Sequence, residues 1–193
     1  MNFITHLPSP SGRVSKHDGP VEQHLTEGAV MLAMSEWLFG QGASEVRVHP
    51  DGTHMAGFDM PAFLSSRGFV RTSATGKREI SWVFKRGDQT LTVHARSGLG
   101  DLVTTIGGAT VEVEAKGGCI NTKHAGQLSR LRKGLHEAVG QLLGCPRTVD
   151  RLIAAVPLHP ETEKLATRLL PRCRHIGIEI ALVDGSGAVH LRA

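Results

Sequence analysis

Two runs of alternating side chains meet at a pair of glycines, and this pattern constrains the fold of the chain more strongly than any other. Residues 101–106 and 109–116 alternate in polarity on either side of Gly107-Gly108. Two β-rich runs separated by Gly-Gly are typical of a β-hairpin closed by a two-residue turn. Such a turn pairs Ile106 with Ala109 and fixes every residue pair beyond them.

This register places Asp101 opposite Glu114. Directly opposed residues have Cβ atoms about 4.5–5.5 Å apart, so the two carboxylates are expected to lie close together. Because side chains alternate between the faces of a strand, Glu112 and Lys116 share the face of Glu114. The other face carries a set typical of a core: Leu102, Thr104, Val111, Val113 and Ala115. The hairpin is therefore predicted to pack one face and to hold an acidic cluster on the other, with a lysine at its edge.

A cluster of this kind has the chemistry of a metal-dependent hydrolase. Carboxylate oxygens are the ligands that Mg²⁺ or Mn²⁺ prefers. A metal held by Asp101 and Glu114 would polarise a phosphate and lower the pKa of a bound water, and Lys116 would orient that water or stabilise charge on the phosphate. The alternative is an exposed face on which Lys116 only screens solvated acids. The registered aspartate and the amphipathic helix that follows favour the catalytic interpretation.

The remaining patterns predict a mixed α/β domain. Helical spacing of apolar residues predicts helices from Pro20 to about Phe39, within 57–70, over about 123–143 and from Pro160, with Asp18 as the first N-cap. Alternating or apolar runs predict strands at 45–49, 79–85, 90–96, 151–157 and 178–183. We expect a flexible arm over residues 1–19 and one domain over 20–193, with a mixed central sheet flanked by helices.

Composition narrows the class of protein further. The 193 residues are 40% hydrophobic, which fits one globular domain. The excess of basic residues, 22 against 18 acidic ones, suits an anionic partner without requiring it. Cys119, Cys145 and Cys173 form no Cys-x-x-Cys pair, so we predict neither a structural zinc site nor a disulfide framework. Without an apolar run that suits a signal peptide or membrane span, a cytoplasmic protein with no membrane partner is expected.

The hairpin residues resemble the PD-(D/E)xK nuclease superfamily, the fold of many restriction endonucleases. Its pattern is an acid at the start of one strand, an acid-x-Lys on the next strand and then a helix. Gly100-Asp101 matches the first half and Glu114-Ala115-Lys116 the second, with Gly100 in place of the usual proline. The order of elements over 20–183 resembles its αβββαβ core with an inserted hairpin and short helix. The resemblance implies an Mg²⁺- or Mn²⁺-dependent endonuclease that hydrolyses phosphodiester bonds, with metal bound by Asp101, Glu114 and the backbone carbonyl of Ala115.

The resemblance also implies two supporting residues. Many members carry a metal-binding glutamate on the first helix, for which Glu27 is the first candidate and Glu22 its competitor; either could instead be an ordinary surface glutamate. Some members use a glutamine on the helix after the lysine strand as a further catalytic residue. Gln127 matches that position, and its alternative is a residue of the helix surface.

The expected partner is nucleic acid. The helix that begins near Lys123 is rich in basic residues, which would contact a phosphate backbone or else form a solvated face. Aromatic residues are only 4% of the chain, which favours double-stranded DNA over a stacked single strand. A homodimer is expected, because cleavage of both strands of a duplex usually requires two active sites. The alternatives are an inactive nucleic-acid-binding or assembly protein with the same fold and an unrelated α/β enzyme.

Overall fold

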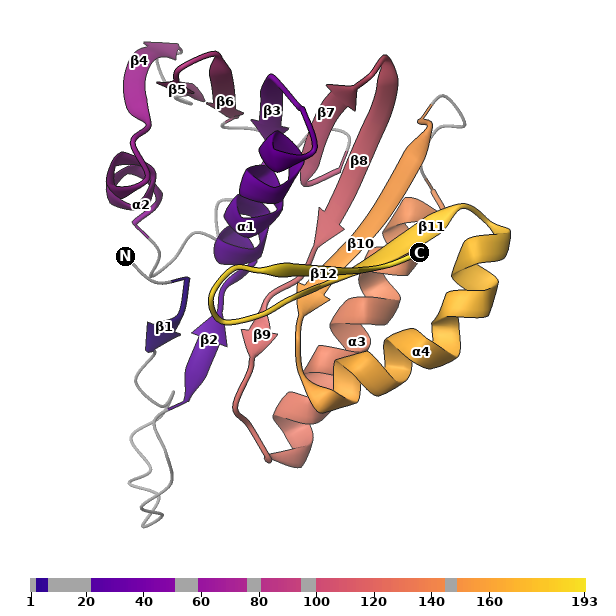
Figure 1. Ribbon diagram of the computed structural model, residues 1–193. Helices are drawn as coiled ribbons and strands as arrows, with labels where there is room; N and C mark the ends of the chain where they lie inside the picture. The colour runs from indigo at the N-terminus through magenta and orange to yellow at the C-terminus, as the bar shows by residue number, and fades with distance from the viewer. Residues whose placement is uncertain (1–2, 7–21, 51–58, 76–80, 95–99, 145–148) are drawn as a thin grey trace.

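A nine-stranded mixed sheet forms the centre of the computed structural model, which describes residues 3–6, 22–50, 59–75, 81–94, 100–144 and 149–193 (Figure 1). The strands of this part of the chain are β1 (Thr5–His6), β2 (Gln23–Leu25), β3 (Glu45–Val48), β4 (Val70–Thr75), β5 (Ser81–Arg86), β6 (Gln89–Val93), β7 (Leu102–Ile106), β8 (Ala109–Ala115), β9 (Gly118–Cys119), β10 (Arg151–Pro157), β11 (Ile178–Val183) and β12 (Val189–Arg192). The helices are α1 (Glu27–Gly40), α2 (Met60–Ser66), α3 (Ala125–Leu142) and α4 (Pro160–His175). The prediction of a mixed sheet flanked by helices is confirmed.

The strand order of the large sheet is β12-β11-β10-β8-β7-β3-β6-β5-β4, and β1-β2-β9 form a smaller sheet. Strand β10 runs parallel to both β8 and β11, whereas β7 and β8 are antiparallel. The run of apolar residues in β10 is explained by this central place, because a strand with neighbours on both edges and helices on both faces meets little water.

The predicted hairpin register is confirmed. Strands β7 and β8 pair from Ile106 with Ala109 to Leu102 with Val113. Gly107 and Gly108 have φ angles of 58° and 88°, the positive values that a tight turn of type I′ requires at both central positions. The ladder ends at Leu102, so Asp101 lies one residue beyond the paired strand.

Helices cover the two faces of the sheet separately. Val113 and Ala115 of β8 belong to a core with α1, whereas Ala154 and Val156 of β10 belong to a second core with α3 and α4 (Figure 1). Because side chains alternate along each strand, Glu114 projects to the face opposite α1. The acidic side chains of β8 therefore lie on the side of the sheet that α3 covers in part.

The first helix begins later than predicted. It starts at Glu27, and the side chain of Thr26 caps it by accepting a hydrogen bond from the Ala29 amide at 3.2 Å. The predicted start at Pro20 and its cap Asp18 lie outside the described residues, but the segment directly before the helix is strand β2. Pairing with β1 and β9 overrides the helical spacing there, which is why a local pattern extended the helix too far.

Other differences lie at sheet edges and near the N-terminus. The short strands β1, β2, β4, β9 and β12 were not predicted, since two to six residues of ordinary composition carry little periodicity. The predicted short helix is confirmed as α2, with Asp59 as its cap. Phe3, within the expected arm, is buried against Phe63 with ring centroids 4.7 Å apart, and residues 7–19 lie outside the described part. No helix among the described residues is long and apolar enough to cross a membrane.

Candidate active site

Three carboxylates converge on one lysine where β7, β8 and α1 meet. The Nζ atom of Lys116 lies 3.7 Å from Oε1 of Glu27, 3.7 Å from Oδ2 of Asp101 and 3.8 Å from Oε2 of Glu114. The Asp101 and Glu114 oxygens can be no farther apart than the sum of their two distances to Nζ. That bound is wider than the roughly 4–5 Å that separates two oxygens on one metal ion, but a side-chain hydrogen bond joins Asp101 and Glu114 and brings their carboxyl groups within that range. The structure thus brings together four of the residues expected from the sequence.

The hairpin backbone positions Asp101 and Ala115. The amide of Asp101 donates to the carbonyl of Val113 at 3.1 Å, and Oδ2 of Asp101 accepts from the amide of Ala115 at 2.8 Å. The next amide, that of Lys116, points the other way and donates to Ala155 of β10 at 2.9 Å. Because backbone groups alternate sides along a strand, the carbonyl of Ala115 projects towards Asp101. This is the direction that a backbone ligand to a metal near Asp101 needs.

The close approach of two backbones brings in Glu27. A Cβ atom at Gly117 would lie 2.5 Å from the amide nitrogen of Glu27 and 2.7 Å from the carbonyl oxygen of Leu25. Only glycine leaves room for this approach, which sets the start of α1 beside the end of β8. Glu22, the competitor, lies before β2 and pairs with His24 at 3.2 Å instead. Glu27 is therefore the glutamate that joins the cluster.

Burial makes the repulsion between the acids strong. The side chains of Glu27, Asp101, Glu114 and Lys116 are between 9% and 17% exposed. Burial raises the pKa of Glu114 to about 8, the Asp101 carboxylate adds to the increase, and Lys116 opposes it. Three acids against one lysine leave a negative excess when all are ionised. The alternative of an exposed, solvated face is wrong, because Glu112 and Glu114 are buried at 1% and 7% exposure.

Gly100 explains the departure from the usual Pro-Asp pattern. Its φ angle is 64°, and a Cβ atom there would lie 2.6 Å from Cγ of Glu112. Proline fixes φ near −65°, so it could not adopt this conformation. The glycine thus makes room for a further acid of β8 directly beside Asp101.

Gln127 lies farther from the cluster along α3 than the residue that contacts Lys116. Helix α3 packs on the cluster through Gly134, where an added Cβ atom would contact Cβ of Lys116 at 3.3 Å. Gln127 is seven residues earlier, about 10 Å along the helix axis, so its catalytic role stays a prediction. Two basic residues of this helix have acidic partners: Arg132 binds Glu161 at 2.8 Å and Lys133 lies 3.3 Å from Glu137.

Sequence reasoning missed a pair of histidines next to Asp101. His49 and His94 follow the parallel strands β3 and β6, and their rings stack with centroids 4.5 Å apart. The amide of His49 donates to the carbonyl of Asp101 at 2.8 Å. Burial lowers the pKa of His94, and the nearby His49 lowers it further. Both histidines fall within the strands predicted at 45–49 and 90–96, but the pairing of those strands was not visible in the sequence.

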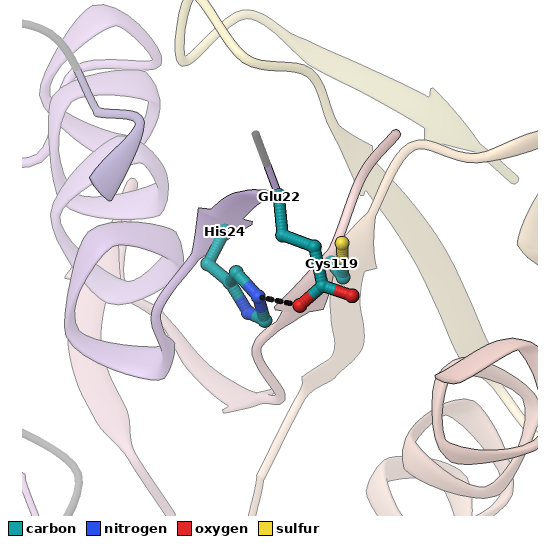
Figure 2. A group of neighbouring side chains, drawn as sticks. All are labelled: Glu22, His24 and Cys119. Atoms are coloured by element: carbon teal, nitrogen blue, oxygen red, sulfur yellow. Dashed lines mark hydrogen bonds and ion pairs between the residues drawn. The ribbon is translucent and has the colours of Figure 1, made fainter. Parts of the chain in front are cut away.

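A second missed group combines Glu22, His24 and Cys119, whose ligating atoms all lie within 4.8 Å of one another (Figure 2). Glu22 and His24 lie two residues apart, but the sequence predicted a helix there, so their shared face on an extended segment was not foreseen. Cys119 comes from a distant segment, so only the tertiary structure joins it to the other two.

No family model, curated protein or solved structure matches the chain.

Proposed function

We propose that this chain is a divalent-metal-dependent nuclease with a restriction-endonuclease-like core, and that Asp101 and Glu114 hold its metal ion. The observation that carries the proposal is the convergence of Glu27, Asp101 and Glu114 on Lys116 at 3.7–3.8 Å. The order α1, β3, β7, β8, α3 and β10, with α2 and β4–β6 inserted after β3 and β10 parallel to β8, supports the proposed αβββαβ core.

The donor set suits Mg²⁺ or Mn²⁺. Carboxylate oxygens from two strands and a helix, with a carbonyl directed to the same side, are hard ligands of the type these ions select. A buried excess of carboxylates costs free energy unless a further cation is present. A surplus of acids around Lys116 is therefore better explained by cation binding than by an ordinary structural ion pair.

Each residue then has a distinct part in phosphodiester hydrolysis. The bound ion would polarise the scissile phosphate and lower the pKa of a coordinated water. Asp101 and Glu114 supply its carboxylate ligands, and the carbonyl of Ala115 a neutral one. Lys116 orients the attacking water and stabilises negative charge on the phosphate. Glu27 supplies a further carboxylate from the first helix as a candidate ligand, and it helps to hold the lysine, whose Nζ lies 3.7 Å away.

Nucleic acid is the proposed substrate, double-stranded DNA first. The scarcity of aromatic residues argues against a stacking platform for single strands. Arg130 is exposed on α3, the helix that packs against Lys116, and Lys123 is exposed just before this helix, so basic side chains are available for phosphate contacts. A homodimer would present two such sites to the two strands of a duplex.

The experiment compares plasmid cleavage in Mg²⁺ or Mn²⁺ by the wild type and three variants. Asp101→Asn keeps an oxygen for the Ala115 amide but removes the charge, and Lys116→Met keeps the apolar stem against Gly134. Asp88→Asn, in the exposed turn after β5, is the matched control. We expect cleavage to fall about a thousandfold or more in the first two variants and to stay unchanged in the control.

Mn²⁺ binding by calorimetry gives a second reading that does not need activity. The proposal requires binding to weaken in Asp101→Asn and to persist in Asp88→Asn. Equal cleavage by every variant would identify a contaminant and overturn the proposal. DNA binding without cleavage would favour the alternative of a non-cutting nucleic-acid-binding protein, and single-stranded and RNA substrates in parallel define the class of nucleic acid.

A further inference from the structure

The three-stranded sheet brings together a second group of metal-ligating side chains, separate from the acidic cluster. Strand β2 pairs antiparallel with β9, and this pairing sets His24 directly opposite Cys119. Glu22 lies two residues before His24, and therefore on the same face. Figure 2 shows the carboxylate, imidazole and thiol directed into one space between the two segments.

The three ligating atoms are already close to the spacing of a metal site. Nε2 of His24 lies 3.2 Å from Oε2 of Glu22, and the thiol sulfur of Cys119 lies within 4.8 Å of both ligating atoms. A tetrahedral Zn²⁺ ion with ligands at about 2.0–2.3 Å keeps its donor atoms roughly 3.3–3.8 Å apart. Side-chain movements of about 1 Å would therefore complete three corners of a tetrahedron.

The surroundings hold these side chains in place. Cys119 is 1% exposed, while the side chains of His24 and Glu22 are 16% and 33% exposed. Oδ1 of Asn121 accepts hydrogen bonds from the Cys119 thiol at 3.4 Å and from the Gln23 amide at 2.9 Å, which ties the two segments together. The sulfur end of the group is buried and the carboxylate end reaches solvent, so an ion has a path of entry.

We propose that Glu22, His24 and Cys119 form a binding site for Zn²⁺, with water as the fourth ligand. Sulfur and imidazole nitrogen are donors that Zn²⁺ favours and Mg²⁺ does not. The chain then has two metal sites of different chemistry, an oxygen-only site on the large sheet and a mixed site on the small one. This second site does not depend on the proposed nuclease activity.

Its place in the chain indicates a structural use. His24 lies three residues before Glu27, and Cys119 lies three residues after Lys116. An ion bound to both strands would fasten together the segments that meet at Gly117, where the two backbones approach most closely. Metal binding to the folded state alone stabilises it by mass action. Zn²⁺ would thereby keep Glu27 and Lys116 in contact.

The rival explanation is a plain ion pair of Glu22 with His24 beside an inert buried thiol. It predicts no thiolate ligation of any added metal. The two explanations therefore differ in a spectroscopic signal that reports on sulfur alone, and this signal is insensitive to ions bound at other histidines.

The test uses the full chain, stripped of metal by a chelator under reducing conditions and titrated with Co²⁺ and then Zn²⁺. We expect a thiolate-to-cobalt charge-transfer band that saturates at one ion per chain and is bleached by Zn²⁺. The band should vanish in Cys119→Ser, and Co²⁺ affinity should fall at least about tenfold in His24→Gln. Cys173→Ser, which changes another buried thiol, and His136→Gln on the exposed side of α3 are the matched controls and should retain both.

Thermal unfolding provides the second reading. Zn²⁺ should raise the Tm of the wild type and of both controls, and have no such effect on His24→Gln. If Cys119→Ser fails to fold, the His24→Gln variant still decides the question. An absent band in the wild type, or an equal band in Cys119→Ser, overturns the proposal. Asp101→Asn should bind Zn²⁺ as the wild type does, so failure of one metal site is distinguishable from failure of the other.

Discussion

The carboxylates around Lys116 and the single carboxylate of Asp184 have opposite surroundings in this molecule. Around Lys116, the acids Glu27, Asp101 and Glu114 share one cation and lie beyond hydrogen-bond distance of it, at 3.7–3.8 Å. In the turn between β11 and β12, Asp184 has several donors to itself. Negative charge accumulates around Lys116, whereas hydrogen-bond donors compensate the charge of Asp184.

The turn at Asp184 shows the hydrogen bonds that surround a carboxylate with a structural role. Its oxygens accept from the amide and hydroxyl of Ser186 at 2.8 and 2.6 Å, from the amide of Ala188 at 3.1 Å and from His190 at 3.0 Å. Burial raises the pKa of Asp184, but these hydrogen bonds outweigh it and lower the pKa to about 2. Glu114 has the opposite shift, to about 8, because burial and Asp101 both disfavour its charge. The comparison separates a carboxylate that stabilises the fold from one that destabilises it until a cation binds.

The largest expected effect is on the pH dependence of stability at Glu114. The pKa of Glu114 is raised in the folded state. Its contribution to the free energy of unfolding is therefore fully present below about pH 4.5 and is lost as the pH rises through about 8. In metal-free buffer, Glu114→Gln should therefore match the wild type at pH 4.5 and become more stable by up to several kcal/mol towards pH 8. Urea unfolding at several pH values measures the difference. A variant that is less stable at pH 8 would show that ionised Glu114 stabilises the fold.

Removal of the lysine charge should have the opposite sign. Lys116→Met leaves buried carboxylates without their cation, which costs about 3 kcal/mol in the free energy of unfolding at pH 7 without metal. Lys164→Met, on the exposed side of α4, should change it by less than about 0.5 kcal/mol. Chemical denaturation with and without Mn²⁺ is the measurement, and Mn²⁺ should recover part of the loss. Equal stability of the two variants would mean that the lysine does not balance the acids.

A smaller loss is expected at the structural carboxylate. Asp184→Asn should destabilise the protein by about 1–2 kcal/mol at pH 7, because hydrogen bonds to a charged acceptor are the stronger ones. Its pKa is lowered in the folded state, so this contribution is present above pH 3.8 and is lost as the pH falls through about 2. Unfolding curves between pH 2 and pH 7 check the direction. Stabilisation by this variant would remove the contrast with Glu114→Gln.

An effect of similar size is expected at the backbone beside Asp101. Gly100→Ala should cost about 1–2 kcal/mol, because the residue has a positive φ and its Cβ atom would meet Glu112. Gly40→Ala is the control, since a Cβ atom there has no neighbour within 4 Å. Thermal unfolding of the two variants gives the comparison. An unchanged Tm for Gly100→Ala would show that Glu112 moves aside without cost.

Local signals predicted one half of the candidate site. The pair Gly107-Gly108 determines a turn, the turn determines a register, and the register sets the start of β7 beside Glu114; each step depends on neighbours in sequence. Gly100 shows the limit of such reasoning, because its reason is the side chain of Glu112 twelve residues away. The sequence motif shows that the usual proline is replaced by glycine, but it does not show why.

Long-range packing determined the other half. Glu27 reaches Lys116 because β2 and β9 pair across more than ninety residues, and no periodicity near Glu27 encodes that pairing. The same pairing replaced the predicted first turns of the helix with a strand and joined Cys119 to His24. In each case the decisive partner lies in a distant segment, so the missing information was tertiary rather than local.

The close approach at Gly117 has a consequence for recognising related chains. The backbone atoms around it are only 2.5–2.8 Å from any added Cβ atom, so a side chain there would separate the glutamate of the first helix from the lysine. A sequence that retains the acid-x-Lys tripeptide but carries a bulky residue directly after it cannot assemble this four-residue cluster in the same way. The informative signature is therefore Glu-x-Lys-Gly, in which the last letter reports whether the helix can reach the strand.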